Sequence, residues 1–561
     1  MTQATTAVYS APASSAASSL KTKDTDTPPR ETSPDTKRED QDHPQPDQPI
    51  KGRICGRKYL DELDKENAPN PEYGPIKEVD TDMRLTLTEL LTKNGNEWIV
   101  LKYADDDTEN PFKWNKWRRR FMSSLLNLMT LFIGLATTAY SSGISSMCSD
   151  LNASNELGQM GLFTFNVACA VAPLFLAPFC ELVGRKVIYA GAYGCFTLCF
   201  VGLALGKNIQ TIIVMRLLLG LFGCVGTILV GGTFSDMYDP VERARPMAMF
   251  SYVAILGTVG APIYAGFIDE TLGWRWIEGI QGLSNVPLLI IILLFFKETR
   301  GGVGLHKRAK QLRQATGDER YVSEMDLETE DLKDLLKASS VKAVHMLVTE
   351  PVVFAFGLWI AFAWFVVFLF LSVIPITFQE QRGWSEGVAG LPYISLCIGV
   401  TLGYLCHHTF QMPKYEKIAN DEERKAVPET RLYGAVFGAA FFPLGLFIYS
   451  FTQYGYLPWI APTIALAPIS FGIYFVFEST YSYTSDCYGE SSSSAIAAQG
   501  LMRNTLGAVS PLFASQFFHN VGSQYAGLIL SIIGTFLSLV PLVFFKYGHK
   551  LRERSKLARE F

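Results

Sequence analysis

Three ionisable side chains lie inside long apolar runs, where a charge needs a specific reason to be present. Arg216, Glu478 and Arg503 each sit well within such a run. A charged group deep in a bilayer costs several kcal/mol unless it faces water or a partner, so these residues are functional candidates by default. Glu478 can take up and release a proton, and Arg503 can bind an anionic group of a substrate or pair with a carboxylate.

The runs that carry Glu478 and Arg503 follow each other in the sequence, so we expect the two side chains to lie close together. The hypothesis is that Glu478 is protonated and released in a cycle while Arg503 tunes its proton affinity. The alternative is that Glu478 reaches the inner loop and belongs to a fixed charge cluster with Asp486. For Arg216, the alternative is a structural clamp that donates hydrogen bonds to helix carbonyls.

Aromatic side chains accompany these charges. Trp359, Trp364, Tyr474, Phe477 and Tyr481 lie in two of the apolar runs. If they face a cavity, they suit flat or amphiphilic organic substrates. The alternative is that they face lipid or neighbouring helices.

The elements that position these residues are membrane-spanning helices. The chain has 561 residues, 48% of them apolar and only 18% charged. Crossing a bilayer takes about 20 mostly apolar helical residues. Twelve such runs occur, near 121–142, 160–180, 187–205, 211–234, 246–268, 277–296, 351–375, 388–405, 432–450, 457–480, 495–518 and 526–545. We therefore predict an all-α polytopic membrane protein.

The runs divide into two sets of six. We predict an N-terminal six-helix bundle over 116–296, a cytosolic central loop over 297–349, and a C-terminal six-helix bundle over 350–546. Residues 1–115 are rich in Pro and charge and are predicted to form a disordered cytosolic tail, and 547–561 a second tail. Lys and Arg concentrate in alternate loops, which places both termini in the cytosol.

A charged motif ends the second run. Glu181 precedes Gly184, Arg185 and Lys186, and Asp236, Glu242 and Arg243 follow the fourth run on the same side. Helix-end acids can pair with helix N-termini or with basic groups. We interpret this set as a charge network that closes the cytosolic side and opens in an alternate state; ordinary solvated helix ends are the alternative.

These segments resemble motifs of one family. The second-run motif resembles the G-x-x-x-D-x-x-G-R-K/R motif of the major facilitator superfamily, with Ala177 and Glu181 replacing Gly and Asp. Gly257, Gly260, Pro262 and Gly266 resemble its antiporter motif. Segments 107–114 and 483–489 are similar to motifs of the fungal twelve-span drug:proton antiporter family. The resemblance covers about residues 105–556.

The resemblance implies the major facilitator fold, with twelve transmembrane helices in two halves that alternate access to a central cavity. It implies a role for Arg216 in proton coupling. The antiporter motif is the main reason to prefer export over uptake, although glycines also serve general helix packing. We expect export of secondary metabolites, organic acids or drugs by proton antiport. Uptake by proton symport is the alternative, and a non-transporting membrane sensor is the third interpretation.

Other classes of function lack their motifs. No G-x-x-x-x-G-K-[ST] loop, H-E-x-x-H pair, G-x-S-x-G elbow or redox C-x-x-C occurs in the sequence, so we predict neither an enzyme nor a cofactor. A metal role for His407 and His408 is not expected, and the net charge of −4 gives no reason to expect nucleic acid. We expect a monomer whose partners are a small-molecule substrate, protons and the lipid bilayer.

The location can be predicted in part. Asn152-Ala153-Ser154 forms a glycosylation sequon in the first outer loop, where it would face the lumenal side. We expect the plasma membrane, with the vacuolar membrane as the alternative.

Overall fold

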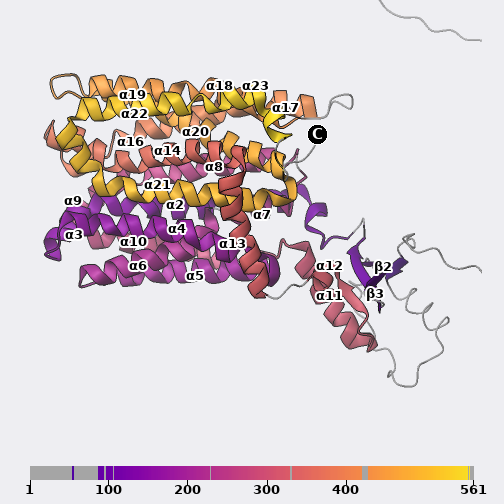
Figure 1. The fold of residues 1–561 in the computed structure, drawn as a ribbon. Helices are drawn as coiled ribbons and strands as arrows, with labels where there is room; N and C mark the ends of the chain where they lie inside the picture. Colours follow the sequence, from indigo (N-terminus) through magenta and orange to yellow (C-terminus); the bar gives the residue numbers. More distant parts are fainter. Residues whose placement is uncertain are drawn as a thin grey trace, which may run out of the picture. The chain divides into compact units, whose positions relative to one another are not determined.

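The computed structural model describes residues 53–55, 86–93, 96–104, 107–227, 229–239, 241–328, 332–419, 427–553, 555 and 557. Long helices run side by side through most of this part of the chain (Figure 1).

The first half of the helical bundle comprises η2 (Pro111–Lys113), α2 (Lys116–Ala139), η3 (Tyr140–Gly143), α3 (Ile144–Asp150), α4 (Asn155–Val183), α5 (Arg185–Ala204), α6 (Ile209–Gly223), η4 (Cys224–Gly226), α7 (Leu229–Ser235), α8 (Ala244–Gly260), α9 (Pro262–Leu272) and α10 (Trp274–Phe295). Pro262 begins α9, because its fixed φ and missing N–H suit the first turn of a helix.

The second half comprises α14 (Pro351–Pro375), η5 (Ile376–Glu380), α15 (Glu386–Ala389), α16 (Tyr393–Cys406), η6 (His407–Gln411), α17 (Met412–Ala419), η7 (Pro428–Arg431), α18 (Leu432–Ala439), α19 (Phe441–Thr452), α20 (Ile460–Tyr488), η8 (Gly489–Ser491), α21 (Ser492–Val521), α22 (Ser523–Leu537) and α23 (Val540–Arg552). Both η5 and η6 are single π-helical turns that extend α14 and α16.

Eleven of the described helical segments are long and apolar enough to cross a membrane. They coincide with eleven of the twelve predicted spans. The remaining one, predicted at 495–518, is α21, which has 30 residues but carries Gln499, Arg503 and Asn504 among other polar side chains. Helix α21 packs against α14 and α4 inside the bundle, and Gln499, Arg503 and Asn504 are buried there, so these polar side chains contact protein and not lipid.

Large apolar side chains on the outer helices are exposed. Leu198 in α5, Leu294 in α10 and Ile464 in α20 are among them. A soluble protein rarely leaves so many large apolar groups in contact with water, whereas a bilayer solvates them. We call the end of the bundle where α2 and α14 begin the basic end, and the other end the far end.

A small four-stranded sheet is formed by segments that precede and follow the first half in the sequence. Strand β1 (Arg53–Cys55) pairs with β2 (Thr86–Lys93), and β2 pairs with β3 (Asn96–Tyr103), both antiparallel; β3 pairs in parallel with β4 (Tyr321–Ser323). The prediction of a disordered tail over 1–115 is therefore wrong for 86–93 and 96–103. These strands find their partner in the central loop, which composition alone does not reveal; residues 1–52 and 56–85 lie outside the described residues.

The central loop is also more ordered than a simple linker. It contains α11 (Gly301–Thr316), α12 (Glu324–Glu328) and α13 (Leu332–Thr349), and α13 runs at a steep angle to the bundle helices (Figure 1). Ile99 and Leu101 of β3, Ala309 and Leu312 of α11, and Tyr321 of β4 form a separate small core.

An ion pair fixes this small core to the start of the bundle. Arg308 of α11 is 6% exposed and donates to Asp107, at 3.1 Å from Nη2 to Oδ1, and to Glu109 at 2.7 Å. Burial lowers the pKa of Arg308, but both carboxylates raise it and the net shift is upward. The segment 107–114 thus binds the central loop through its two acidic side chains.

Candidate functional site

A cavity opens at the far end between the two halves. It has a volume of about 450 Å³, within the range of small-molecule sites. Its lining is polar and includes Gln159, Gln379 and the carboxylates of Glu156, Glu380 and Glu386. Each carboxylate has a partner: Glu380 pairs with His519 at 2.8 Å, Glu156 accepts from Gln516 at 3.2 Å, and Glu386 shares a hydrogen bond with the Asp269 carboxyl. We call this space the far-end cavity.

A second, smaller space lies inside the bundle, lined by residues of both halves. It measures about 30 Å³, which is room for a water molecule. The second half contributes Trp364, Phe368, Phe477, Arg503 and Asn504; the first half contributes Phe165, Asn166 and a group of hydroxyl side chains, Thr130, Thr137, Thr227 and Thr258. We call it the central cavity.

The predicted binding residues divide between this cavity and other places. Trp364, Phe477 and Arg503 line it, and the Tyr481 hydroxyl accepts a hydrogen bond from Arg503. Trp359 instead lies fully buried against Phe356 in the core of the second half. The sequence shows how far along a helix an aromatic residue lies, but only packing decides which face points to the cavity.

Tyr474 has yet another position. Its hydroxyl donates to the carbonyl of Ala248 in α8 at 3.5 Å, so it reaches from the second half to the first on the side of the basic end. The structure therefore brings Tyr474 to a contact between the halves rather than to the central cavity.

Arg503 is 2% exposed. Its Nη1 donates to the Tyr481 hydroxyl at 2.8 Å and its Nε to Oδ1 of Asn504 at 3.1 Å. The guanidinium lies over the rings of Trp364 and Phe477, 4.8 and 5.3 Å from their centres. Within the described ranges it forms no ion pair, so neither Glu478 nor any other carboxylate neutralises it.

Arg216 of α6 is completely buried in the first half. It donates to the carbonyls of Ala136 at 3.0 Å and Thr137 at 3.4 Å in α2, and it lies 3.9 Å from the centre of the Tyr140 ring. The alternative interpretation, a clamp on helix carbonyls, is thus present in the structure. Its Nε is buried without a hydrogen bond among the described residues, so the clamp leaves part of the guanidinium unsatisfied.

A carboxylate that the sequence analysis missed completes this region. Glu278, near the start of α10, is 3% exposed, and its Oε2 has no hydrogen-bond partner in the described part of the chain. It interacts electrostatically with Arg216, Tyr140 and Tyr264. Its place at the edge of a predicted span resembled an ordinary helix-end acid, and only the packing of α10 against α5 and α9 buries it.

Glu478 has a different partner from either of those predicted. Its Oε2 lies 3.6 Å from Nδ1 of His407, and its Oε1 accepts from Ser482 at 2.7 Å. Asp486 pairs with Arg431 instead, at 2.7 Å. Both His407 and Glu478 are almost fully buried, and neither ring nitrogen of His407 makes a hydrogen bond within the described chain. His407 begins the π-helical turn η6, a local feature that is frequent at functional sites.

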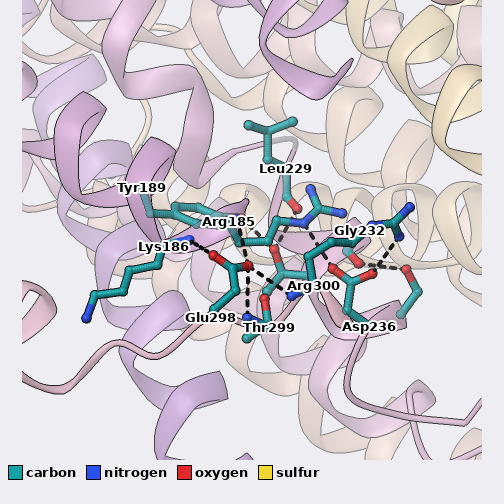
Figure 2. A network of polar contacts seen from close by, with 11 residues as sticks. Arg185, Lys186, Tyr189, Leu229, Gly232, Asp236, Glu298, Thr299 and Arg300 are labelled. Carbon is teal, nitrogen blue, oxygen red and sulfur yellow. Dashed lines mark hydrogen bonds and ion pairs between the residues drawn. The ribbon is translucent and has the colours of Figure 1, made fainter. Parts of the chain in front are cut away.

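The basic end of the first half carries the charged motif (Figure 2). Arg185 donates from Nε to Asp236 at 3.0 Å, and Arg300 donates to the other oxygen of Asp236 at 3.2 Å. Glu298 accepts from the backbone N–H groups of Arg185 and Lys186 at 2.8 and 3.0 Å. An acid thus caps the N-terminus of α5, as helix-end electrostatics favours.

That capping acid is Glu298, after α10, whereas Glu181 forms no hydrogen bond or ion pair with the described residues. Gly184 lies at φ 103°, and a Cβ there would meet Oε2 of Glu298 at 2.5 Å. Gly184 therefore lets the Glu298 carboxylate approach α5, which explains why this position needs glycine.

The contacts of Arg185 and Asp236 stay within the first half and the adjoining start of the central loop, where Glu298 and Arg300 lie directly after α10. Arg243 does reach the second half, where its Nη2 donates to the Ser485 hydroxyl at 2.9 Å. Arg245 pairs with Glu416 at 2.7 Å across the same boundary. Ala244 and Ala248 pack there against Met412 and Tyr415. These contacts join the two halves at the basic end.

The glycines of the antiporter-like motif lie at close helix contacts. A Cβ on Gly257 would meet the carbonyl oxygen of Leu131 at 2.7 Å, and one on Gly266 would meet that of Glu386 at 2.8 Å. Gly260 has more room, with its nearest neighbour Cys397 at 3.9 Å. Gly257 thus packs α8 against α2, while Gly266 packs α9 against α15 of the other half.

Two further predictions concern the surface and metals. Asn152 is exposed in the turn between α3 and α4 at the far end, with φ 50°, and Ser154 of the sequon caps α4. Among the described residues no group of three or more His, Cys, Asp or Glu side chains could hold a metal ion.

Comparisons with known proteins agree with this architecture. Residues 126–511 match the family model of the Major Facilitator Superfamily. The chain is 30% identical to the MFS-type efflux pump MFS2 of Trichophyton rubrum, over 82% of this chain and 78% of that protein. It is 30% identical to the multidrug transporter mdrA of Aspergillus fumigatus (81% and 75%) and to the efflux pump FUB11 of Gibberella moniliformis (82% and 78%). The solved proton:xylose symporter XylE has a TM-score of 0.55 at 17% identity, covering 77% of this chain and 96% of XylE.

Proposed function

Because the chain belongs to the major facilitator superfamily, we propose that it exports small organic molecules by proton antiport with alternating access. It is a multi-pass membrane transporter and not an enzyme. The proposed cargo is a secondary metabolite, an organic acid or a drug. We place the protein in the plasma membrane with both termini and the basic end in the cytosol.

One observation carries the proton-coupled part of the proposal: the buried pair of His407 and Glu478. A lone carboxylate in a low-dielectric site is expensive to keep charged, and a neighbouring imidazole can share one proton with it. The distance of 3.6 Å leaves the pair without a proper hydrogen bond in this state. Such a pair can hold a proton in one conformation and lose it in another at little structural cost.

The conformation suggests when that proton is released. Here the halves are in contact at the basic end, through Arg243, Arg245 and Tyr474, and the far-end cavity opens at the opposite end. Tyr474 packs directly against His407, with ring centres 5.9 Å apart. Opening of the basic end would remove Tyr474 from Ala248 and admit water near His407 and Glu478. A proton held there would then leave toward the cytosol.

Arg216 and Glu278 form a second candidate coupling site, in the first half. The Glu278 carboxylate lacks a hydrogen-bonded partner for Oε2, and Arg216 keeps an unsatisfied Nε. A proton on Glu278 removes the charge that attracts Arg216 and would leave Arg216 bound to α2 alone. Protonation from the far end could in this way change how α6 and α10 pack.

The direction of transport rests on the names of relatives, which include efflux pumps and a multidrug transporter. The test is uptake into inside-out vesicles, with and without a pH gradient that is acidic inside. A panel of labelled drugs, organic acids and fungal metabolites serves as substrate. Export by antiport predicts gradient-stimulated accumulation of at least one class.

The controls separate the alternatives. Glu478→Gln should abolish stimulation by the gradient while keeping substrate exchange at equal pH. Stimulation by the reversed gradient, or accumulation only in right-side-out vesicles, would mean uptake by symport. Unchanged gradient-driven transport in Glu478→Gln would remove the coupling role of the His407–Glu478 pair.

A further inference from the structure

The central cavity has an unbalanced charge. Arg503 is the one charged side chain among the described residues that line it. A buried guanidinium without a counter-ion is unfavourable by several kcal/mol, even after its contacts with aromatic rings are counted. Because no carboxylate of the described residues balances this charge, we expect an anionic ligand that enters the cavity to supply the negative charge.

The guanidinium is held with donors to spare. Two of its five N–H groups bond to Tyr481 and Asn504, which fix its plane. Asn504 is itself anchored, since its Nδ2 donates to the carbonyl of Cys169 in the first half at 3.0 Å. The remaining N–H groups can bind a carboxylate, the planar anion that the fork of a guanidinium fits best.

The aromatic side chains that line the central cavity determine what the rest of the ligand should be. Trp364 and Phe477 flank Arg503, and Phe165 and Phe368 extend the aromatic wall. The Trp364 and Phe477 rings contact each other, with centres 5.4 Å apart, so a flat ring can pack against this wall by offset or edge-to-face contact. The threonine group of the first half, Thr130, Thr137, Thr227 and Thr258, supplies hydroxyls on the opposite side.

The far-end cavity has the opposite electrostatic character. Glu156 and Glu380 line it, and Glu380 pairs with the half-exposed His519; Glu386, also in the lining, shares a hydrogen bond with the Asp269 carboxyl, so that pair holds a proton. An anion that leaves Arg503 toward the far end therefore meets negative charge, which weakens its rebinding there. This arrangement favours release of an anion in the direction of the proposed export.

We propose that the central cavity binds an aromatic organic anion, with its carboxylate on Arg503 and its ring against the wall that Trp364 and Phe477 form together. The inference names the substrate class of the proposed transport function and rests on it. The cavity of about 30 Å³ in this state must widen to admit such a molecule, and the adjoining far-end cavity of about 450 Å³ is large enough to receive it.

The test is binding to the purified full-length protein in detergent, measured by calorimetry at constant pH. The probes are 2-naphthoate, the uncharged 2-naphthamide and the cationic 2-naphthylmethylammonium, which share one ring system. Wild type is expected to bind the carboxylate at least about tenfold more tightly than the amide, a ratio that corresponds to about 1.4 kcal/mol. The cation is expected to bind most weakly.

The variants assign the preference to Arg503. Arg503→Gln should remove the carboxylate preference, and Arg503→Lys should keep a reduced one, because a point charge remains. Arg382→Gln is the matched control. The Arg382 side chain is partly buried, donates to the carbonyls of Thr377 and Tyr454, and does not line the central cavity. It should leave the preference unchanged. Trp364→Leu should weaken 2-naphthoate more than cyclohexanecarboxylate.

Several results would overturn the inference: equal affinity for carboxylate and amide, a preference for the cation, no binding of 2-naphthoate at millimolar concentration, or a carboxylate preference that survives Arg503→Gln in a folded variant. The readout needs no pH gradient. A carboxylate preference together with symport in vesicles would keep the inference and refute the direction of transport, whereas antiport without a carboxylate preference would do the reverse.

Discussion

The contact between Arg243 and Ser485 should hold the basic end closed. The Arg243 guanidinium donates to the Ser485 hydroxyl at 2.9 Å between the two halves, in a part-buried position. A hydrogen bond that involves a charged group contributes about 1.5–3 kcal/mol. Arg243→Ala should therefore raise the ratio of basic-end-open to basic-end-closed molecules by about 10- to 150-fold, at about 1.4 kcal/mol per factor of ten.

Arg245 is the matched control, because it makes an ion pair across the same boundary in a more exposed setting. The side chains of Arg245 and Glu416 are 61% and 28% exposed. Solvent screens such a pair, which is then worth about 0.2–1 kcal/mol. Arg245→Ala should therefore shift the same ratio by no more than about fivefold.

The assay measures access to the basic end. Ala248→Cys, introduced in a background without native cysteines, places a thiol in the buried contact with Met412 and Tyr415. A charged, membrane-impermeant maleimide applied to the cytosolic side labels it only when the halves separate. The labelling rate should rise with the open population in Arg243→Ala. A thiol at Ser142, in the far-end cavity, should label more slowly from the opposite side.

Two results would refute this reasoning. Equal acceleration by Arg243→Ala and Arg245→Ala would show that burial does not set the strength of these contacts. Faster labelling at both positions would indicate loosening of the whole fold rather than a shift between two states, and thermal unfolding of each variant distinguishes that outcome.

Three further predictions concern coupling and stability. Glu478→Gln should keep most of the wild-type rate of substrate exchange at equal pH. Its gradient-driven accumulation should fall at least about tenfold, because a neutral amide cannot bind and release a proton in the cycle. A parallel loss of both activities would indicate misfolding. Gly390→Ala should lower the thermal unfolding midpoint, because the new Cβ would lie 2.4 Å from the backbone oxygen of Pro262 and overpacking costs about 1–3 kcal/mol. Gly191→Ala is the control: a Cβ there has no neighbour within 4 Å, so the midpoint should not change. Arg308→Gln should make the central loop more sensitive to limited proteolysis, because breaking its buried ion pair with Asp107 costs about 3–5 kcal/mol. Arg320→Gln is the control, because the Arg320 side chain is exposed, and it should not change the cleavage. Equal cleavage of both variants would refute the role of Arg308.

The membrane-spanning helices could be predicted from the sequence because their length and polarity obey a local rule. A helix in lipid must satisfy its own backbone and present apolar side chains, so each span leaves a readable run of residues. The run at 495–518 is still readable because the small and apolar residues of α21 outnumber its polar ones. The sequence likewise indicated that Arg216, Glu478 and Arg503 would be buried charges, as they are.

The partners of those charges were decided only by the tertiary structure. His407 and Glu478 are 71 positions apart, and Arg503 meets Tyr481 rather than Glu478 although both lie on α20. A helix turns by about 100° per residue, so a rotation of one helix exchanges one set of neighbours for another without any change in its hydropathy. For the same reason Trp364 faces the central cavity while Trp359 faces the core.

Long-range pairing explains the remaining differences. Glu298 caps α5 from more than a hundred residues away, and β3 pairs with β4 across the entire first half of the bundle. Such contacts depend on where the chain returns after many turns, which no local pattern encodes. The sequence by itself thus determined which segments cross the membrane and which side chains carry charge into it. The folded structure decided which of those charges are paired, which one is left for a ligand, and where the two halves meet.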